Sequence, residues 1–341
     1  MRALRLERPG PFADATTLGE RLRLREVPLP EPGAGQLCLR VTACAVCRTD
    51  LQLVAGELAA HRLPVVPGHQ AVGVVEAVGP GVSDWTRGQR AGAFWLAFAD
   101  GTCDQCLAGR ENLCRSGEFT GWDRDGGYAG AMLVDADFAL PLPKGFDDLA
   151  AAPLLCGGVI GYRALRVAGV APGARLGLFG FGASARLVLQ VARHWGCEVY
   201  VAARGVADRR EALALGATWA GGFEERPPVA LDAAITTAPV GRAIVAALEA
   251  LDRGGVVAVN AIHLDEVPAF PYELLWWERA VRSVANVTRA DAREFLALAA
   301  AIPIRTAIEV HPLADGAQAL QRVAASGVEG TPVLVPGPED R

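Results

Sequence analysis

Hydrophobic positions follow two different patterns along the chain. In the first part, alternating segments bounded by glycine and proline predict strands at residues 36–43 and, more deeply buried, 71–79. From about residue 175, short apolar runs alternate with segments of helical periodicity. The later segments predict strands at 175–179, 197–202, 231–236, 255–261 and 333–335, and helices at 183–195, 208–215, 241–251 and 291–301.

This order of elements predicts an α/β protein with two domains. Strands that alternate with helices at this spacing form a doubly wound parallel sheet of the Rossmann type. We assign residues 158–287 to that sheet, and residues 1–157 and 288–341 to an irregular β-rich domain. A chain of 341 residues is long enough to split in this way.

Composition narrows the possible function classes. With 33 Lys+Arg and 38 Asp+Glu the net charge is −5, which argues against a nucleic-acid partner. The 51% of hydrophobic residues excludes extensive disorder. We expect neither a secretory signal nor a membrane span, because no apolar segment of the required kind occurs. The eight cysteines are then expected in a reduced, cytoplasmic setting as metal ligands, catalytic groups or core residues.

A glycine-rich turn follows the strand predicted at 175–179. A G-x-G-x-x-A pattern is a weak signal alone, but here it lies between a strand and a helix, as a dinucleotide-binding loop requires. The first glycine permits the turn, the second lets the backbone approach a pyrophosphate, and the helix start presents free N–H groups to the phosphates. The residues expected to bind cofactor here are Gly180, Phe181, Gly182, Ala183 and Ala185.

The end of the next strand indicates which dinucleotide is bound. An NAD site has an acidic residue about 20 positions after the loop. Here the sequence has no carboxylate and instead has Arg204, which together with Arg209 could pair with a 2′-phosphate. We therefore predict a preference for NADP over NAD. The alternative is that Arg204 is a solvated loop charge and that the protein accepts either cofactor.

A compact cluster of zinc-ligand residue types begins at Asp100. Three cysteines at tight spacing on a glycine-containing loop can converge tetrahedrally on zinc, and four ligands leave no open position, as in a structural site. The carboxylate is a harder ligand than a thiolate, so binding is expected to be weaker. The alternative is three free thiols, which would oxidise readily. The predicted ligands are Asp100, Cys103, Cys106 and Cys114.

A second set, Cys47, His69 and Cys156, is dispersed along the chain. Two thiolates and one imidazole leave a fourth zinc position open, as catalysis requires. Taken singly, each could be an ordinary buried residue. Together, and beside a dinucleotide fold, they favour a catalytic zinc site. The remaining cysteines, Cys38, Cys44 and Cys197, lie in or near apolar strands and are interpreted as structural.

With these motifs the sequence resembles the zinc-containing medium-chain alcohol dehydrogenase family. The likeness runs through nearly the whole chain. It rests on the order and spacing of Cys47-Arg48-Thr49-Asp50, Pro67-Gly68-His69, the Cys103/Cys106/Cys114 lobe, Gly126-Gly127-Tyr128-Ala129, Leu155-Cys156-Gly157-Gly158, Gly180-Phe181-Gly182, Pro271–Trp276 and Ser283–Asn286.

The resemblance implies a GroES-like catalytic domain, a Rossmann cofactor domain, and homodimers or homotetramers. It also implies roles for single residues. Thr49 would relay the substrate proton, Asp50 would orient the ligand shell, and Arg48 would approach the pyrophosphate. Trp95, with Trp122, would line the substrate pocket, although Trp95 could equally be an ordinary core residue.

Four positions depart from the family pattern. Gln70 follows the histidine where a glutamate is usual; this removes a negative charge near the metal, and we group Gln70 with Thr49 and Asp50 as catalytic. Gln52 stands where a histidine often passes the proton on, which leaves the later relay open. The other two departures are Asp100, in place of the first lobe cysteine, and Arg204, in place of the acid that selects NAD.

These features predict reversible hydride transfer between NADP(H) and a non-ionic aliphatic or aromatic alcohol or aldehyde. The expected cofactors are one catalytic and one structural zinc ion per chain, in addition to the nicotinamide. Gln70 and Gln52 keep open a related reductase that acts on an activated C=C or C=N bond. A non-catalytic nucleotide-binding protein of the same fold is the third possibility, and the Cys/His/Cys set with Thr49 argues against it.

Overall fold

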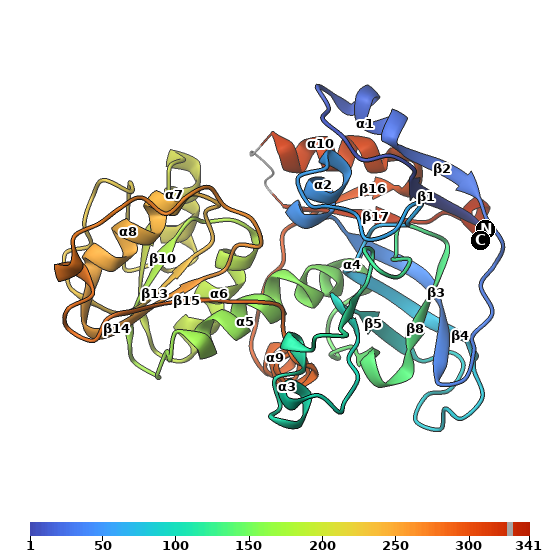
Figure 1. Cartoon of the computed structure of the whole chain (residues 1–341), viewed down its shortest axis with the longest axis horizontal. Coiled ribbons are helices and arrows are strands. Elements are labelled where there is room, and N and C mark those ends of the chain that lie inside the picture. The colour runs from blue at the N-terminus through green and yellow to red at the C-terminus, as the bar shows by residue number, and fades with distance from the viewer. Residues whose placement is uncertain (326–329) are drawn as a thin grey trace. The chain divides into compact units, whose positions relative to one another are not determined.

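The computed structural model describes residues 1–325 and 330–341 (Figure 1). The chain divides into two compact units. The first unit comprises Met1–Cys156, Asn286–Ala301 and Arg305–Arg341, and the second comprises Gly157–Ala285 and Ile302–Ile304. Within the described residues, no helix combines the length and the apolar character needed to cross a lipid bilayer.

A six-stranded parallel sheet is the centre of the second unit, in the order β12-β11-β10-β13-β14-β15. The order reverses between β10 and β13, and open α/β sheets bind ligands at such a switch point, beyond the carboxyl ends of the strands. The strands are β10 (Arg175–Phe179), β11 (Glu198–Ala202), β12 (Trp219–Gly221), β13 (Leu231–Thr236), β14 (Leu251–Val259) and β15 (Ala280–Ser283).

Four helices accompany this sheet: α5 (Gly157–Val167), α6 (Ala183–His194), α7 (Val206–Ala214) and α8 (Gly241–Ala250). Helix α6 buries the face that its periodicity predicts, with Leu187, Val188, Val191 and Ala192 all inside. Helix α8 packs on the sheet through an apolar core that includes Phe179, Ile244 and Leu248. Because each fully buried aliphatic or aromatic side chain contributes about 1.5–3 kcal/mol, such buried faces hold the helices to the sheet.

The first unit is built on a seven-stranded sheet with the path β16-β17-β3-β4-β5-β9, while β8 pairs with β3. All pairs are antiparallel except β16 with β17. Two small sheets, β1–β2 and β6–β7, complete it. The strands are β1 (Arg2–Leu6), β2 (Leu22–Glu26), β3 (Gln36–Ala45), β4 (Ala71–Val78), β5 (Arg90–Ala93), β6 (Leu96–Phe98), β7 (Glu118–Phe119), β8 (Ala131–Asp135), β9 (Leu140–Pro141), β16 (Ile308–Pro312) and β17 (Thr331–Val335).

Short helices connect these strands. They are α1 (Ala15–Arg21), α2 (Arg48–Ala55), α3 (Asp104–Leu107), α4 (Asp148–Ala151), α9 (Arg289–Ala301) and α10 (Gly316–Ala324). Helix α9 belongs to the first unit, and Arg289 at its start donates to the Glu111 carboxylate of the same unit through its backbone N–H and its guanidinium, at 2.7–3.0 Å. The core of this unit includes Leu37, Val65 and Tyr128.

The structure confirms the predicted α/β class and the predicted elements, with bounds that differ by a few residues. The strand expected at 255–261 is part of the longer β14, which begins at Leu251. Sequence reasoning did not identify the helices α1 to α5 or α10. Helix α2 was missed because it has only eight residues, two of them charged, and therefore shows no apolar stripe longer than two turns.

Candidate active site and metal centres

Helix α2 places three candidate residues in its first turn. Cys47 is the N-cap in an extended conformation, and its N–H donates to Asp50 Oδ2 at 2.9 Å. The carboxylate therefore caps the helix start, where backbone donors otherwise lack partners. Gly56 ends the helix in the left-handed conformation. Arg48, Thr49 and Asp50 follow the cap directly, so their positions are fixed by this short helix.

Cys47, His69 and Cys156 converge in the first unit. Their ligand atoms all lie within 4.8 Å of one another. The two sulfur atoms are 4.0 Å apart, and Nε2 of His69 lies 3.4 Å from Cys156 Sγ. The three come from separate segments: the cap of α2, the turn before β4, and the residue between a 3-10 turn and α5. The fold thus brings Cys156 next to His69, which lies 87 positions earlier in the chain, and next to Cys47, which lies 109 positions earlier.

Asp50 fixes the orientation of the imidazole. Its Oδ1 lies 3.1 Å from Nδ1 of His69 and accepts the Gly68 N–H at 3.2 Å. A hydrogen bond at Nδ1 leaves Nε2 as the free ligand atom, which is how protein carboxylates orient metal-binding histidines. The exposed fractions of the His69 and Asp50 side chains are only 1% and 3%, so neither is free to swing into solvent.

The electrostatics of this group favour a cation. Burial lowers the pKa of His69, but the Asp50 carboxylate and Cys47 raise it to about 10. A hydrogen bond from Cys156 holds the pKa of Cys47 well below its usual range, while that bond and burial raise the pKa of Cys156. Without a metal, the Cys47 thiolate and the Asp50 carboxylate hold a proton on the imidazole, and a metal ion would displace that proton from Nε2. This donor set matches the two sulfurs and one nitrogen that zinc accepts in open catalytic sites.

The other predicted residues of this region lie near the group in different settings. The Oγ1 of Thr49 lies 3.8 Å from Cys47 Sγ. Arg48 is exposed, and its guanidinium donates to the Val323 carbonyl at 3.4 Å. Gln70 is buried and donates to the Ala45 carbonyl at 3.4 Å. Gln52 is also buried, and its Oε1 has no hydrogen-bond partner among the described residues.

Aromatic rings cover one side of His69. Trp95 meets the imidazole edge-on, with ring centroids 4.9 Å apart. Trp122 stacks on Trp95 at 5.7 Å, and Phe119 stacks on both tryptophans. His61 also stacks on Trp122, with ring centroids 3.9 Å apart. Sequence reasoning missed His61 and Phe119, because nothing in their spacing marks them as neighbours of the two tryptophans.

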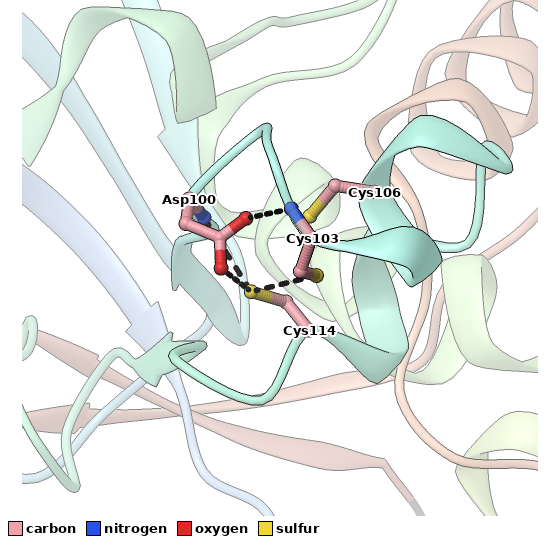
Figure 2. A group of neighbouring side chains, drawn as sticks. All are labelled: Asp100, Cys103, Cys106 and Cys114. Atoms are coloured by element: carbon pink, nitrogen blue, oxygen red, sulfur yellow. Dashed lines mark hydrogen bonds between the residues drawn. The ribbon is translucent and has the colours of Figure 1, made fainter.

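The second predicted cluster also comes together, on the loop around α3. The ligand atoms of Asp100, Cys103, Cys106 and Cys114 all lie within 4.8 Å of one another. Figure 2 shows how Asp100 is used: Oδ1 accepts the Cys103 N–H at 2.8 Å, while Oδ2 faces Cys114 Sγ at 3.3 Å. The same Oδ1 accepts the Thr102 N–H at 2.8 Å. One carboxylate oxygen therefore shapes the turn, and the other is left for a metal.

Hydrogen bonds set the charge state of this cluster. Backbone donors and the Cys114 thiol hold the pKa of Asp100 well below its usual range. The backbone N–H of Cys106 lowers the pKa of Cys103. Desolvation, together with side-chain hydrogen bonds to Cys103, Cys114 and Asp100, raises the pKa of Cys106 to about 12. Three sulfurs and one carboxylate oxygen suit zinc, and they would close its four positions. All eight cysteines of the chain are free thiols.

The dinucleotide loop has the geometry that its glycines predict. Gly180 has φ +102°, and a Cβ there would lie 2.7 Å from Ala238 N and from Thr237 Oγ1, so a larger residue would not fit. Gly182 is the N-cap of α6, and the space around it is open. The first N–H groups of α6 lack intrahelical partners and can face an anion. Phe181 and Ala185 are buried and hold the turn.

Arg204 and Arg209 differ in their settings at the end of β11. Arg209 donates to the carbonyls of Ala203 and Arg204, at 2.8 and 3.2 Å, and thereby braces the loop. Arg204 is exposed. Arg209 is thus engaged with the backbone, whereas Arg204 lies at the surface.

Comparison with known proteins agrees with this geometry. Residues 33–144 match the alcohol dehydrogenase GroES-like domain. The chain is 46% identical to the probable alcohol dehydrogenase AdhA of Mycobacterium tuberculosis (strain CDC 1551 / Oshkosh). The alignment of 341 positions covers 98% of this chain and 97% of that protein.

Two solved structures share the fold along almost the entire length. One is the cobalt- and zinc-bound thermostable alcohol dehydrogenase from Pyrobaculum aerophilum, with a TM-score of 0.88 and 27% identity. The other is a putative zinc-binding dehydrogenase from Sinorhizobium meliloti 1021 bound to NADP, with a TM-score of 0.85 and 28% identity. Both alignments cover 98% of this chain and 99% of the other.

Proposed function

The chain belongs to the zinc-containing medium-chain alcohol dehydrogenase family, and from this premise we propose that it is a zinc-dependent alcohol dehydrogenase and aldehyde reductase that uses NADP(H). The observation that carries the proposal is the convergence of Cys47, His69 and Cys156 within 4.8 Å. The metal-bound Pyrobaculum relative and the NADP-bound Sinorhizobium relative support the two cofactors.

Each residue of the site has a defined task in this proposal. Cys47, His69 and Cys156 hold the zinc, and Asp50 keeps Nε2 of His69 directed at it. Zinc supplies a Lewis acid that lowers the pKa of the substrate hydroxyl. Thr49, beside Cys47, takes the substrate proton at Oγ1 or returns it during reduction. The nicotinamide supplies the hydride chemistry, and the protein supplies its position.

The aromatic cover indicates the substrate class. Trp95 lies edge-on to His69, Trp122 stacks on Trp95, and His61 stacks in turn on Trp122. Rings fixed in this way exclude water from the reacting atoms and suit a non-ionic aliphatic or aromatic alcohol. The compact lobe of Asp100 and three cysteines would hold a second zinc ion, in a structural role. Reduced thiols at both sites fit a cytoplasmic protein.

A screen with and without a chelator tests the proposal. NADPH oxidation is measured with benzaldehyde, a ketone and an enal. Aldehyde reduction that is lost on chelation, and regained with zinc, supports the zinc-dependent enzyme. Enal reduction that survives chelation supports instead the reductase of an activated double bond, which Gln70 and Gln52 keep open. NADPH binding without turnover of any substrate would make the chain a non-catalytic nucleotide-binding protein.

Arg204→Ala tests the cofactor preference. Loss of a charge-assisted contact of about 1.5–3 kcal/mol should weaken NADPH binding roughly tenfold or more, while NADH, which lacks the 2′-phosphate, is little affected. Dissociation constants from fluorescence titration measure this. Arg210→Ala, at an exposed arginine further along α7, is the matched control and should change neither constant. Equal losses for the two cofactors in the Arg204 variant would contradict the preference.

A further inference from the structure

Tyr128 carries a buried hydroxyl that the mechanism does not use. Among the residues that the structure describes, Tyr128 is the largest fully buried side chain, with an exposed fraction of 0%. Its oxygen has no hydrogen-bond partner among residues 1–325 and 330–341. Buried polar groups are nearly always paired, and an orphan in a native structure needs an explanation. The surroundings of the ring supply one.

The Tyr128 ring packs against the turn that delivers His69. The Tyr128 N–H donates to the Pro67 carbonyl at 3.0 Å, and the Gly127 N–H donates to the Gly68 carbonyl at 2.7 Å. Gly68 has φ +98°, and a Cβ on it would lie 2.4 Å from Cδ1 of the ring. The ring therefore lies directly against Gly68. Gly68 and His69 are the two residues of this turn that contact Asp50 Oδ1.

Asp50 has room for one more donor. Its Oδ1 has two partners, Gly68 N and His69 Nδ1, whereas the Cys47 N–H is the partner of Oδ2. An ionised carboxylate offers about four acceptor positions. Burial raises the pKa of Tyr128, and negative charge on Asp50 raises it further. A tyrosine phenol is protonated at neutral pH, so this hydroxyl is a donor, and its environment includes an acceptor with spare capacity.

We propose that Tyr128 is a positioning residue of the metal site: its hydroxyl donates to the Asp50 carboxylate, and through Asp50 it keeps His69 aligned on the zinc. This inference rests on the proposed function, because it assumes a metal at Cys47, His69 and Cys156. The hydrogen bond from Tyr128 would stand behind the one by which Asp50 orients His69. Loss of a group that orients a metal ligand typically costs 10- to 100-fold in metal affinity.

Zinc release from Tyr128→Phe tests the proposal. The zinc-loaded protein is mixed with the chromogenic chelator 4-(2-pyridylazo)resorcinol, and the release phases are timed. The phase that disappears in Cys156→Ser belongs to the candidate catalytic site, and the phase that Asp100→Asn accelerates belongs to the lobe. In Tyr128→Phe we expect the first phase to be roughly tenfold faster and the second to be unchanged.

Tyr200→Phe is the matched control. Tyr200 is also buried, at 3% exposed, but it lies in the other unit and donates to Glu198 at 2.7 Å. Its loss should leave both phases unchanged. If Tyr128 only fills space, Tyr128→Phe removes an unpaired hydroxyl, so the melting temperature rises and zinc release stays the same; that result overturns the proposal. Acceleration of both phases in Tyr128→Phe would indicate general loosening and would also overturn it.

Failure of the proposed function gives a different result. If the wild-type protein has no release phase that Cys156→Ser removes, no zinc is held at that site, and the assignment of function is wrong. If the phase exists and Tyr128→Phe leaves it unchanged, the zinc site stands and only the role of Tyr128 is wrong.

Discussion

Cys156→Ser is expected to lower kcat/KM for alcohol oxidation by about a thousandfold, because an alkoxide-stabilising metal contributes several kcal/mol and each 1.36 kcal/mol is a factor of ten. Cys156 contacts both other ligands, with Sγ 4.0 Å from Cys47 Sγ and 3.4 Å from His69 Nε2. A serine hydroxyl is a poor substitute for a thiolate ligand of zinc. Steady-state kinetics and zinc content per chain are the two measurements.

Cys197→Ser provides the matched control for this substitution. Cys197 is a buried thiol that donates to the Ala171 carbonyl at 3.5 Å, in the other unit. The same chemical change there should leave zinc content and kcat/KM close to wild type, whatever it does to thermal stability. A Cys156→Ser enzyme with nearly full activity and full zinc content would exclude the Cys/His/Cys site as the catalytic centre.

Thr49→Val should lower kcat by roughly a hundredfold or more while zinc content stays at the wild-type level, because positioned proton transfer contributes about 10²–10⁴ to the rate. Valine has the shape of threonine but lacks the hydroxyl, whose oxygen lies 3.8 Å from Cys47 Sγ. The ligand atoms themselves are untouched, so metal binding and proton transfer are separated in this variant. Steady-state kinetics with zinc analysis of the same samples checks both.

Thr49→Ser retains the hydroxyl and is the control for the Thr49 prediction. It should keep most of the turnover, because the proton acceptor is still present. Thr49→Val within about threefold of wild type would show that the proton leaves by another route, and this threshold is far below the range for general acid–base catalysis. Another group would then have to accept the proton, and Gln52 cannot be that group, because its amide does not ionise.

Local signals in the sequence were sufficient for much of the fold. Strand β10 was predicted with the bounds that it has, Arg175–Phe179, because a short apolar run ends at a glycine and is followed by a helical pattern. The same logic located α6 and β13. Helix α2 could not be found in this way, because capping by Asp50 rather than an apolar stripe defines it. Homodimer or homotetramer assembly stays a prediction of the family resemblance.

The candidate site depended on information that sequence spacing does not contain. Cys47 and Cys156 lie 109 positions apart, so their separation of 4.0 Å follows only from the tertiary fold. The compact lobe differs, because its four residues fit on one loop and their spacing already indicates a common ligand. The double use of Asp100, with one oxygen on the backbone and the other toward Cys114, was not predictable from spacing. Neither was the packing of Tyr128 against Gly68.

Anomalous scattering at the zinc absorption edge, from crystals of the protein purified with zinc present, tests the central claim most directly. The account predicts a peak bonded to Cys47 Sγ and Cys156 Sγ at about 2.3 Å and to His69 Nε2 at about 2.0–2.1 Å. A second peak is expected among Asp100, Cys103, Cys106 and Cys114. A zinc-loaded, active protein whose map has no peak between the two sulfurs and the imidazole would contradict the account.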